Sequence, residues 1–155
     1  MAGEVDARLK DLGITVPEAA APVANYVGFV QSGNLVFVSG QVPLKDGKLQ
    51  YQGKVGAEVS LEDAQEAAKL CAINIIAQLK AACGGDLDRV QRIVKLGGFV
   101  NSVPEYGDQP KVINGASDLM VAVFGDKGKH SRAAVSAGAL PLGVAVEIDA
   151  VAEIA

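Results

Sequence analysis

Residues 26–43 read YVGFVQSGNLVFVSGQVP, and this stretch decides how the fold begins. Two short runs rich in β-branched and aromatic residues, 26–30 and 35–39, are separated by residues 32–34 (SGN). β-Branched and aromatic side chains favour strands, and a short polar segment with glycine favours the turn between antiparallel strands. The stretch therefore predicts a β-hairpin.

The segment that follows the hairpin predicts a second turn. Residues 45–48 (KDGK) combine aspartate and glycine between charged residues, which is typical of a turn. A third, weaker strand is expected at residues 49–51 or around Val55.

A long helix is predicted after this turn. Ser60 and Asp63 resemble a capping box, in which a hydroxyl oxygen accepts a hydrogen bond from a backbone N–H of the first helical turn. We expect the helix to reach about Ala82, where the glycines at 84–85 end it. Apolar residues repeat at helical spacing at Leu61, Ala64, Ala68, Cys71, Ile75 and Leu79.

The second half of the chain predicts one more helix between strands. Residues 90–100 form a plausible central strand, and Asp108 can cap a helix that runs to about Phe124. Residues 132–136 and 144–154 have the apolar pattern of two closing strands.

The order of these elements is β-β-(β)-α-β-α-β-β, which predicts an α+β fold with two helices packed on one face of a sheet. Residues 4–12 can form a further short helix, and we interpret residues 1–22 as a peripheral N-terminal extension. The length of 155 residues fits a single domain, residues 1–155.

The composition bears on the partners of the chain. Hydrophobic residues make up 50% of it and charged residues 21%, so we expect some apolar surface to be buried between subunits. The net charge of -4, with lysines and arginines scattered, disfavours nucleic-acid binding, because a phosphate backbone needs clustered cations.

The two cysteines, Cys71 and Cys83, are expected to be reduced. Twelve helical residues at about 1.5 Å each place them roughly 18 Å apart, too far for a disulfide. Reduced thiols suit a cytoplasmic protein. The first residues lack the pattern of a signal peptide, and no apolar run is long enough to span a bilayer, so we expect no membrane association.

The closing strands carry the chemistry. Arg132 lies on one apolar stretch and Glu147 on the next, across the Leu-Pro-x-Gly segment 140–143. If the two stretches are neighbouring strands, a guanidinium that can grip a carboxylate with two hydrogen bonds lies near a carboxylate that can orient water. That is a minimal hydrolytic site. From the pattern alone, Arg132 fits an ordinary surface arginine as well as a functional one, and a solvated outer-face carboxylate is the default expectation for Glu147.

Residues 24–43 and 130–151 resemble the Rid family (RidA/YjgF), whose members include enamine/imine deaminases. The resemblance rests on the Arg-Ala-x-Val context before a Leu-Pro-x-x-Val turn and on the hairpin with its Ser-Gly-Gln end. It implies a chorismate-mutase-like fold that assembles as a homotrimer, with the helices outside a central β-barrel and clefts between subunits.

The same resemblance assigns the two catalytic roles. Arg132 corresponds to the arginine that binds the substrate carboxylate, and Glu147 to the glutamate that positions the attacking water. Asp149 is on the same face of the strand as Glu147 but matches a position without a usual catalytic role.

Further substrate-binding positions follow from the resemblance. Tyr26 corresponds to an aromatic residue that closes over the substrate from an adjacent subunit; its ordinary reading is a half-buried strand residue. Ser39 and Gly40 correspond to the cleft floor, where glycine lets the backbone approach a ligand. By their position alone they would be a strand-ending turn.

Two substitutions depart from the family pattern. Ala134 occupies a substrate-binding position where a cysteine is frequent, and Pro104 replaces a frequent asparagine. Asn101 or Ser102 can substitute locally for the missing amide. The longer N-terminus and the loop at residues 104–110 indicate a divergent branch.

Other kinds of site have little support. His130 is the sole histidine, which excludes a histidine-cluster zinc site and a two-histidine ribonuclease mechanism within one chain; we place it in the loop that follows the second helix. The chain has no phosphate-binding or dinucleotide glycine motif, and we expect no cofactor and no metal.

The leading hypothesis is cofactor-independent hydrolysis of small 2-imino or enamine acids to 2-oxo acids and ammonia. The alternatives are a non-catalytic module that binds small carboxylate metabolites and, less favoured, an endoribonuclease. The aromatic content of 5% and the acidic balance argue against the last.

Overall fold

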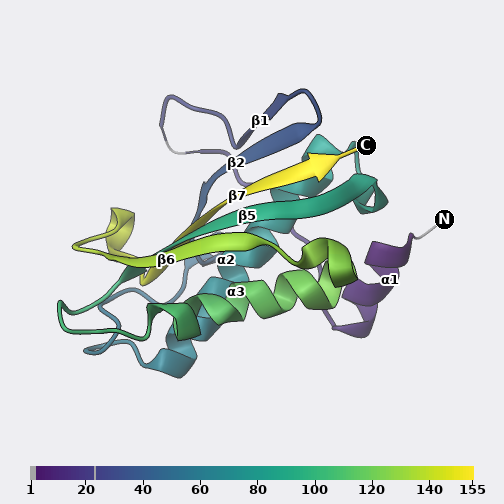
Figure 1. Cartoon of the computed structure of the whole chain (residues 1–155). Coiled ribbons are helices and arrows are strands. Elements are labelled where there is room, and N and C mark those ends of the chain that lie inside the picture. The colour runs from purple at the N-terminus through teal and green to yellow at the C-terminus, as the bar shows by residue number, and fades with distance from the viewer. Residues whose placement is uncertain (1–2, 23) are drawn as a thin grey trace.

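The structure is a computed structural model that describes residues 3–22 and 24–155. Residues 1 and 2, the first positions of the expected extension, and residue 23 lie outside the described residues. A five-stranded sheet forms one layer, and two long helices cover one of its faces (Figure 1). In chain order the helices and strands are α1 Glu4–Asp11, β1 Phe29–Ser32, β2 Leu35–Gln41, β3 Leu44–Lys45, β4 Lys48–Leu49, α2 Leu61–Ala82, β5 Val90–Asn101, α3 Gln109–Phe124, β6 Ser131–Ala137 and β7 Val146–Ile154.

The five-stranded sheet is mixed and has the order β1-β2-β7-β5-β6. β5 and β6 are parallel because α3 connects them as a crossover, whereas the other neighbouring pairs are antiparallel. The predicted α+β class is confirmed, and the sheet is mixed. β6 is an edge strand, and β7, the last strand of the chain, lies inside the sheet between β2 and β5.

The predicted hairpin exists, but its first strand begins later than expected. Gly33 has a φ of 62° at the turn between β1 and β2, a conformation that glycine adopts without steric cost. Tyr26 lies in a bend before β1, where its N–H donates to the carbonyl of Ala24 (2.9 Å). The prediction of a strand from residue 26 is therefore wrong.

The turn at residues 45–48 joins the two short strands β3 and β4, which form a small separate sheet. Asp46 and Gly47 have φ values of 52° and 76°, as a tight two-residue hairpin turn requires. Val55 makes only isolated bridges, to Val59 and Ser102, so the weaker third strand stays outside the main sheet.

α2 begins and ends where the sequence predicts. The Ser60 hydroxyl accepts a hydrogen bond from the N–H of Asp63 (3.1 Å), and Gly84 and Gly85 follow the helix with positive φ. Its buried face includes both alanines and long aliphatic residues. At Gly115 of α3 an added Cβ would overlap the backbone of Gln65, so glycine permits the close crossing of α2 and α3.

α3 follows Asp108, but the Asp108 side chain makes no capping hydrogen bond. The first turn instead contains Pro110, which suits a position whose N–H has no helical partner. Asp108 lies 3.6 Å from the Lys111 ammonium as an exposed ion pair. The predicted helix is confirmed, and the predicted side-chain cap is wrong.

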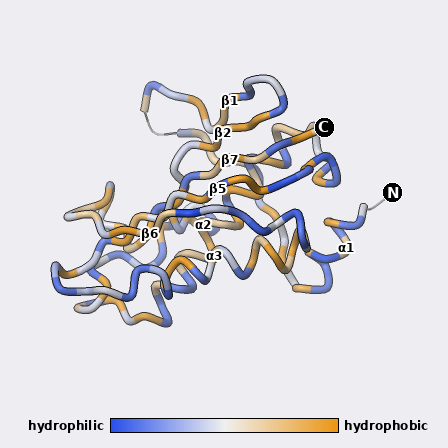
Figure 2. Tube along the Cα trace, viewed as in Figure 1, coloured by the Kyte–Doolittle hydropathy of each residue, from blue (hydrophilic) through white to orange (hydrophobic). Residues whose placement is uncertain are grey.

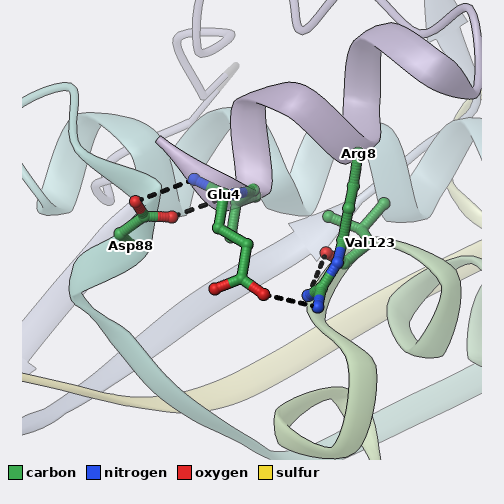
Figure 3. A network of polar contacts seen from close by, with 5 residues as sticks. Glu4, Arg8, Asp88 and Val123 are labelled. Carbon is green, nitrogen blue, oxygen red and sulfur yellow. Dashed lines mark hydrogen bonds and ion pairs between the residues drawn. The ribbon is translucent and has the colours of Figure 1, made fainter. Parts of the chain in front are cut away.

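The short helix α1 is a third helix, packed at one end of α3 (Figure 1). The carboxylate of Asp88 accepts hydrogen bonds from the N–H groups of Glu4 and Val5, each at 3.0 Å (Figure 3). Arg8 donates to Glu4 Oε1 (2.7 Å) and to the Val123 carbonyl (3.3 Å). These contacts tie the N-terminal segment to the domain. The short helix predicted within residues 4–12 is confirmed, so the described residues form three α-helices, two of which lie on the sheet.

The two faces of the sheet differ in burial. On β7, the even-numbered residues from 146 to 154 are buried under the helices, and the intervening residues point to the opposite face, which no helix covers. Along the Cα trace, hydrophobic and hydrophilic residues alternate in the sheet and in the helices (Figure 2). Large exposed apolar residues on the uncovered face are Val30, Leu35, Phe37 and Val135. In the part of the chain that is described, no helix has the length and apolar character needed to cross a membrane.

Candidate functional site

The strands that carry Arg132 and Glu147 are not neighbours in the sheet. β5 lies between β6 and β7, so the condition of direct pairing, under which Arg132 and Glu147 would be close together, is not met. Leu96 of β5 pairs with Arg132 of β6, and Phe99 pairs with Glu147 of β7. The reason is the crossover through α3, which places β6 beside β5 at the edge of the sheet. β7 pairs with the other side of β5, between β5 and β2.

Arg132 and Glu147 also lie on opposite faces of the sheet. Leu96 is buried beneath the helices, and Arg132 shares that face because paired residues of neighbouring strands point the same way. Glu147 alternates with the buried Val146 and Ile148 and therefore belongs to the uncovered face. Within one chain, a small substrate on the Arg132 side chain is separated from Glu147 by the sheet itself.

The guanidinium of Arg132 is held by α3. Its Nη1 donates to the Ser117 hydroxyl (3.0 Å), and its Nη2 donates to the Pro110 carbonyl (3.1 Å). Among the ion pairs of the described residues, none involves Arg132. The plane of the guanidinium is thus fixed by two neutral acceptors, and its charge remains available to an anion.

Ser117 and His130 extend this arrangement, and the sequence analysis missed the connection. His130 lies in the loop before β6, as expected, and its two ring nitrogens contact Ser117 Oγ (2.8 Å) and the Gly128 carbonyl (2.6 Å). No local pattern pairs a helix residue with a loop 13 residues later, because the contact depends on how α3 packs against β6.

Glu147 lies beside the end of β2 on the uncovered face. A Cβ added at Gly40 would lie 3.0 Å from the Glu147 carboxyl carbon, so glycine makes room for this side chain. Burial, and secondarily the charge of Asp149, raises the pKa of Glu147. A partly desolvated carboxylate with a raised pKa is a stronger base than an exposed glutamate. The structure therefore brings Gly40 and Glu147 together.

Asp149 is on the same face, one step along β7. Burial raises its pKa, while the backbone of Gly97 and the charge of Lys95 lower it in part. Asp149 already has this cationic neighbour, whereas no cation is among the causes of the shift at Glu147. Glu147 is therefore the better candidate for a base.

Ser39 and Tyr26 are placed by the same hairpin. The Ser39 hydroxyl donates to the Val27 carbonyl (2.7 Å), and its N–H donates to the Gly28 carbonyl (2.9 Å). These two hydrogen bonds from Ser39 fix residues 27 and 28, which connect Tyr26 to β1. Tyr26 itself is 50% exposed, and its ring is available to a partner rather than to the interior of its own chain.

Ala134 lies two residues after Arg132 on the helix-facing side of β6. It pairs with Gly98 and packs, partly buried, against the core. Arg132 and Ala134 thus share one side of the edge strand.

The amide that Pro104 lacks is not supplied by Asn101. The Asn101 amide donates to the carbonyls of Val144 (3.1 Å) and Gly53 (3.4 Å), and its oxygen accepts from Lys54 (2.7 Å). Asn101 is buried, and both hydrogens of its amide nitrogen are used within the chain, so it cannot donate to a ligand.

Ser102 is also occupied, and a different amide lies nearby. The Ser102 hydroxyl contacts the Ser136 hydroxyl. Gln109, directly before Pro110, donates from Nε2 to Ser136 (2.7 Å) and to the Tyr106 carbonyl (2.7 Å). The sequence analysis did not single out Gln109, because its place next to β6 depends on the conformation of the preceding loop.

Other candidate sites are absent or lie elsewhere. Cys71 and Cys83 are free and buried, and burial raises the pKa of both thiols. No group of three or more histidine, cysteine or acidic side chains in the described residues could hold a metal ion. A groove of about 710 Å³ between residues 12–20, the β3–β4 hairpin and α2 includes neither Arg132 nor Glu147.

The five-stranded mixed sheet with two helices on one face is an α+β domain, the class predicted from the sequence. Residues 6–154 match the family model described as YjgF/chorismate_mutase-like, putative endoribonuclease. The chain belongs to this family, the YjgF/Rid family.

Similar proteins span nearly the whole chain. Protein TCP17 of Trypanosoma cruzi is 49% identical over 153 residues, which cover 98% of this chain and 95% of that protein. The crystal structure of Atu1372 from Agrobacterium tumefaciens, a protein of unknown function, is 53% identical with a TM-score of 0.92 and covers 97% of this chain and 92% of that one. The crystal structure of a putative endoribonuclease from Shewanella oneidensis is 37% identical with a TM-score of 0.94 and covers 98% and 100%.

Proposed function

We propose that this protein is a cofactor-independent hydrolytic deaminase of small 2-imino acids. Water adds to the imine carbon, the carbon–nitrogen bond then breaks, and the products are a 2-oxo acid and ammonia. A protonated imine is already electrophilic, so the protein needs mainly to bind the carboxylate and orient the water.

The observation that carries the proposal is the placement of the Arg132 guanidinium. Two acceptors on α3, Ser117 and Pro110, orient its plane without neutralising its charge. The N–H groups that these acceptors do not use can form a two-pronged hydrogen bond with a planar carboxylate. A lysine would supply the charge but not this fork.

Glu147 has the properties expected of the group that orients water. Its pKa is raised by burial, and the missing side chain of Gly40 leaves room for its carboxylate at the end of β2. In the proposed reaction it accepts a proton from the attacking water as the new C–O bond forms.

The proposed site is shared between subunits of a homotrimer. Arg132 and Glu147 lie on opposite faces of one sheet, so a substrate that touches both requires the edge of one subunit to meet the uncovered face of another. Apolar residues exposed on that face, such as Phe37 (46%) and Val135 (47%), favour its burial in an assembly. Tyr26, also exposed, would cover the substrate from the adjacent subunit.

A second candidate function is a module that binds small carboxylates without turnover. The specific observation in its favour is the loss of one polar contact: Pro104 has no side-chain amide, and the amide of Asn101 is engaged by Lys54, Gly53 and Val144. Such a module would bind the carboxylate through Arg132 in the same way, and Glu147 would have no catalytic role.

The deciding experiment measures hydrolysis of freshly generated imino acids. An amino-acid oxidase with catalase produces 2-imino acids from a panel of amino acids, and a semicarbazide trap reports the imine that remains. We expect the protein to reduce trapping at catalytic concentration and Arg132→Ala to lose this effect. Binding of 2-oxobutanoate without imine turnover would select the binding module, and cleavage of RNA that survives in Arg132→Ala would favour a ribonuclease.

A further inference from the structure

The guanidinium of Arg132 is the end of a chain of three side chains. Arg132 Nη1 donates to Ser117 Oγ (3.0 Å), and Ser117 Oγ lies 2.8 Å from His130 Nε2. The other ring nitrogen, Nδ1, lies 2.6 Å from the carbonyl oxygen of Gly128. No other histidine is present in the sequence.

The direction of each hydrogen bond in this series of side chains follows from the bond between His130 and the Gly128 carbonyl. The Gly128 carbonyl can only accept, so Nδ1 of His130 carries the hydrogen. In the neutral ring Nε2 is then an acceptor, and the Ser117 hydroxyl donates its single hydrogen to it. The lone pairs of Ser117 are thereby turned toward Arg132, whose guanidinium is only a donor.

The end of this hydrogen-bonded series that lies at Gly128 is rigid. Gly128 is buried at the end of the short 3-10 turn Gly125–Gly128, and an added Cβ there would overlap the Met120 carbonyl of α3. Next to it, Arg92 Nε of β5 donates to the Lys129 carbonyl (3.1 Å). The acceptor for His130 is therefore fixed relative to both α3 and β5.

We propose that Ser117 and His130 are positioning residues that set the orientation of Arg132 for recognition of a planar carboxylate. This inference rests on the proposed function, because it assigns Arg132 to the substrate carboxylate. Neither residue touches the substrate: His130 acts through Ser117, and Ser117 acts through Arg132. Without the hydroxyl, Arg132 keeps only the Pro110 carbonyl as an anchor, and its plane can rotate about that contact.

The first test measures binding of 2-oxobutanoate by calorimetry to the full chain. Ser117→Ala and His130→Leu should each bind about three- to tenfold more weakly, the effect of losing one hydrogen bond. Ser117→Thr keeps the hydroxyl and should bind like the parent protein. Asn114→Ala is the matched control, because Asn114 is an exposed residue of α3 with no side-chain hydrogen bond among the described contacts, and its affinity should be unchanged.

The second test uses the nitrogen resonances of the single histidine. The parent protein at neutral pH should show the tautomer with hydrogen on Nδ1, and Ser117→Ala should shift the Nε2 resonance. Addition of 2-oxobutanoate should also shift Nε2 in the parent but not in Arg132→Ala, a response that a purely structural histidine would not give.

The outcomes separate this inference from the proposed function. Parental affinity in Ser117→Ala, together with a histidine signal that is indifferent to 2-oxobutanoate, overturns the positioning role even if imines are hydrolysed. Weaker binding in Ser117→Ala with rescue in Ser117→Thr supports it even if no imine is hydrolysed, in which case only the deaminase proposal fails. A parent protein that binds no 2-oxobutanoate overturns both.

Discussion

Arg132 and Glu147 are separated by strand β5 and point to opposite faces of the same sheet. Two side chains so arranged cannot contact one small molecule within a single chain, although they are only 15 residues apart in the sequence. Because the two side chains lie on opposite faces, the proposed hydrolysis requires that subunits associate.

We expect co-refolded mixtures of Arg132→Ala and Glu147→Gln to recover imine hydrolysis. If each site takes Arg132 from one subunit and Glu147 from another, every site in a trimer of one variant lacks one of the two side chains. A trimer that contains both variants has some sites with both side chains intact. Initial rates of imine hydrolysis measure the recovery, and sedimentation should give three times the chain mass. Mixtures as inactive as the separate variants, or a stable monomer, would contradict a shared site.

Arg132→Lys should bind 2-oxobutanoate at least tenfold more weakly although the positive charge remains, because charge-assisted hydrogen bonds contribute roughly 1.5–3 kcal/mol and an ammonium cannot form the planar fork. Calorimetric titration measures the difference. Equal affinity of the lysine variant would show that planar recognition is the wrong explanation.

Glu147→Gln should preserve 2-oxobutanoate binding and lower the rate of imine hydrolysis by about two to four orders of magnitude, since general-base assistance is typically of this size. Binding and turnover are measured on the same preparation, with circular dichroism as the control for folding. Full activity in this variant would return Glu147 to the class of ordinary strand carboxylates.

The same substitution should raise thermal stability at neutral pH. The pKa of Glu147 is raised by burial, so the folded protein holds this proton more tightly than the unfolded chain does. The contribution of Glu147 to stability is full below its unfolded pKa and is lost as the pH rises through its folded pKa. Glu147→Gln should therefore melt higher than the parent near pH 7, with the difference vanishing near pH 4; a difference that grows toward low pH would show the opposite sign.

Gly40→Ala should slow imine hydrolysis without dissociating the assembly. The added methyl carbon would lie 3.0 Å from the Glu147 carboxyl carbon, closer than ordinary contact, so the carboxylate must move. Gly107→Ala is the control, because a Cβ there has no neighbour within 4 Å and Gly107 is not among the glycines with positive φ. Equal rates for the two variants would remove Gly40 from the site.

Features that depend on neighbours in the sequence could be predicted from it. The cap at Ser60, the glycines after Ala82 and the turn at Gly33 use hydrogen bonds or backbone conformations local to a few residues. The extent of β5 and β7 follows from the apolar pattern of each strand. The start of β1 at Phe29 could not be predicted from the apolar run, because residues 26–28 contact Ser39, which is distant in the sequence, without joining the strand.

Residue types at fixed spacing are enough to identify the family and to mark Arg132 and Glu147 as candidate site residues. Only the tertiary structure decided that β5 separates them, that Gly40 faces Glu147, and that Ser117 joins His130 to Arg132. Strand order and helix packing are set by contacts between residues distant in the chain, through burial and hydrogen bonding that local patterns do not encode.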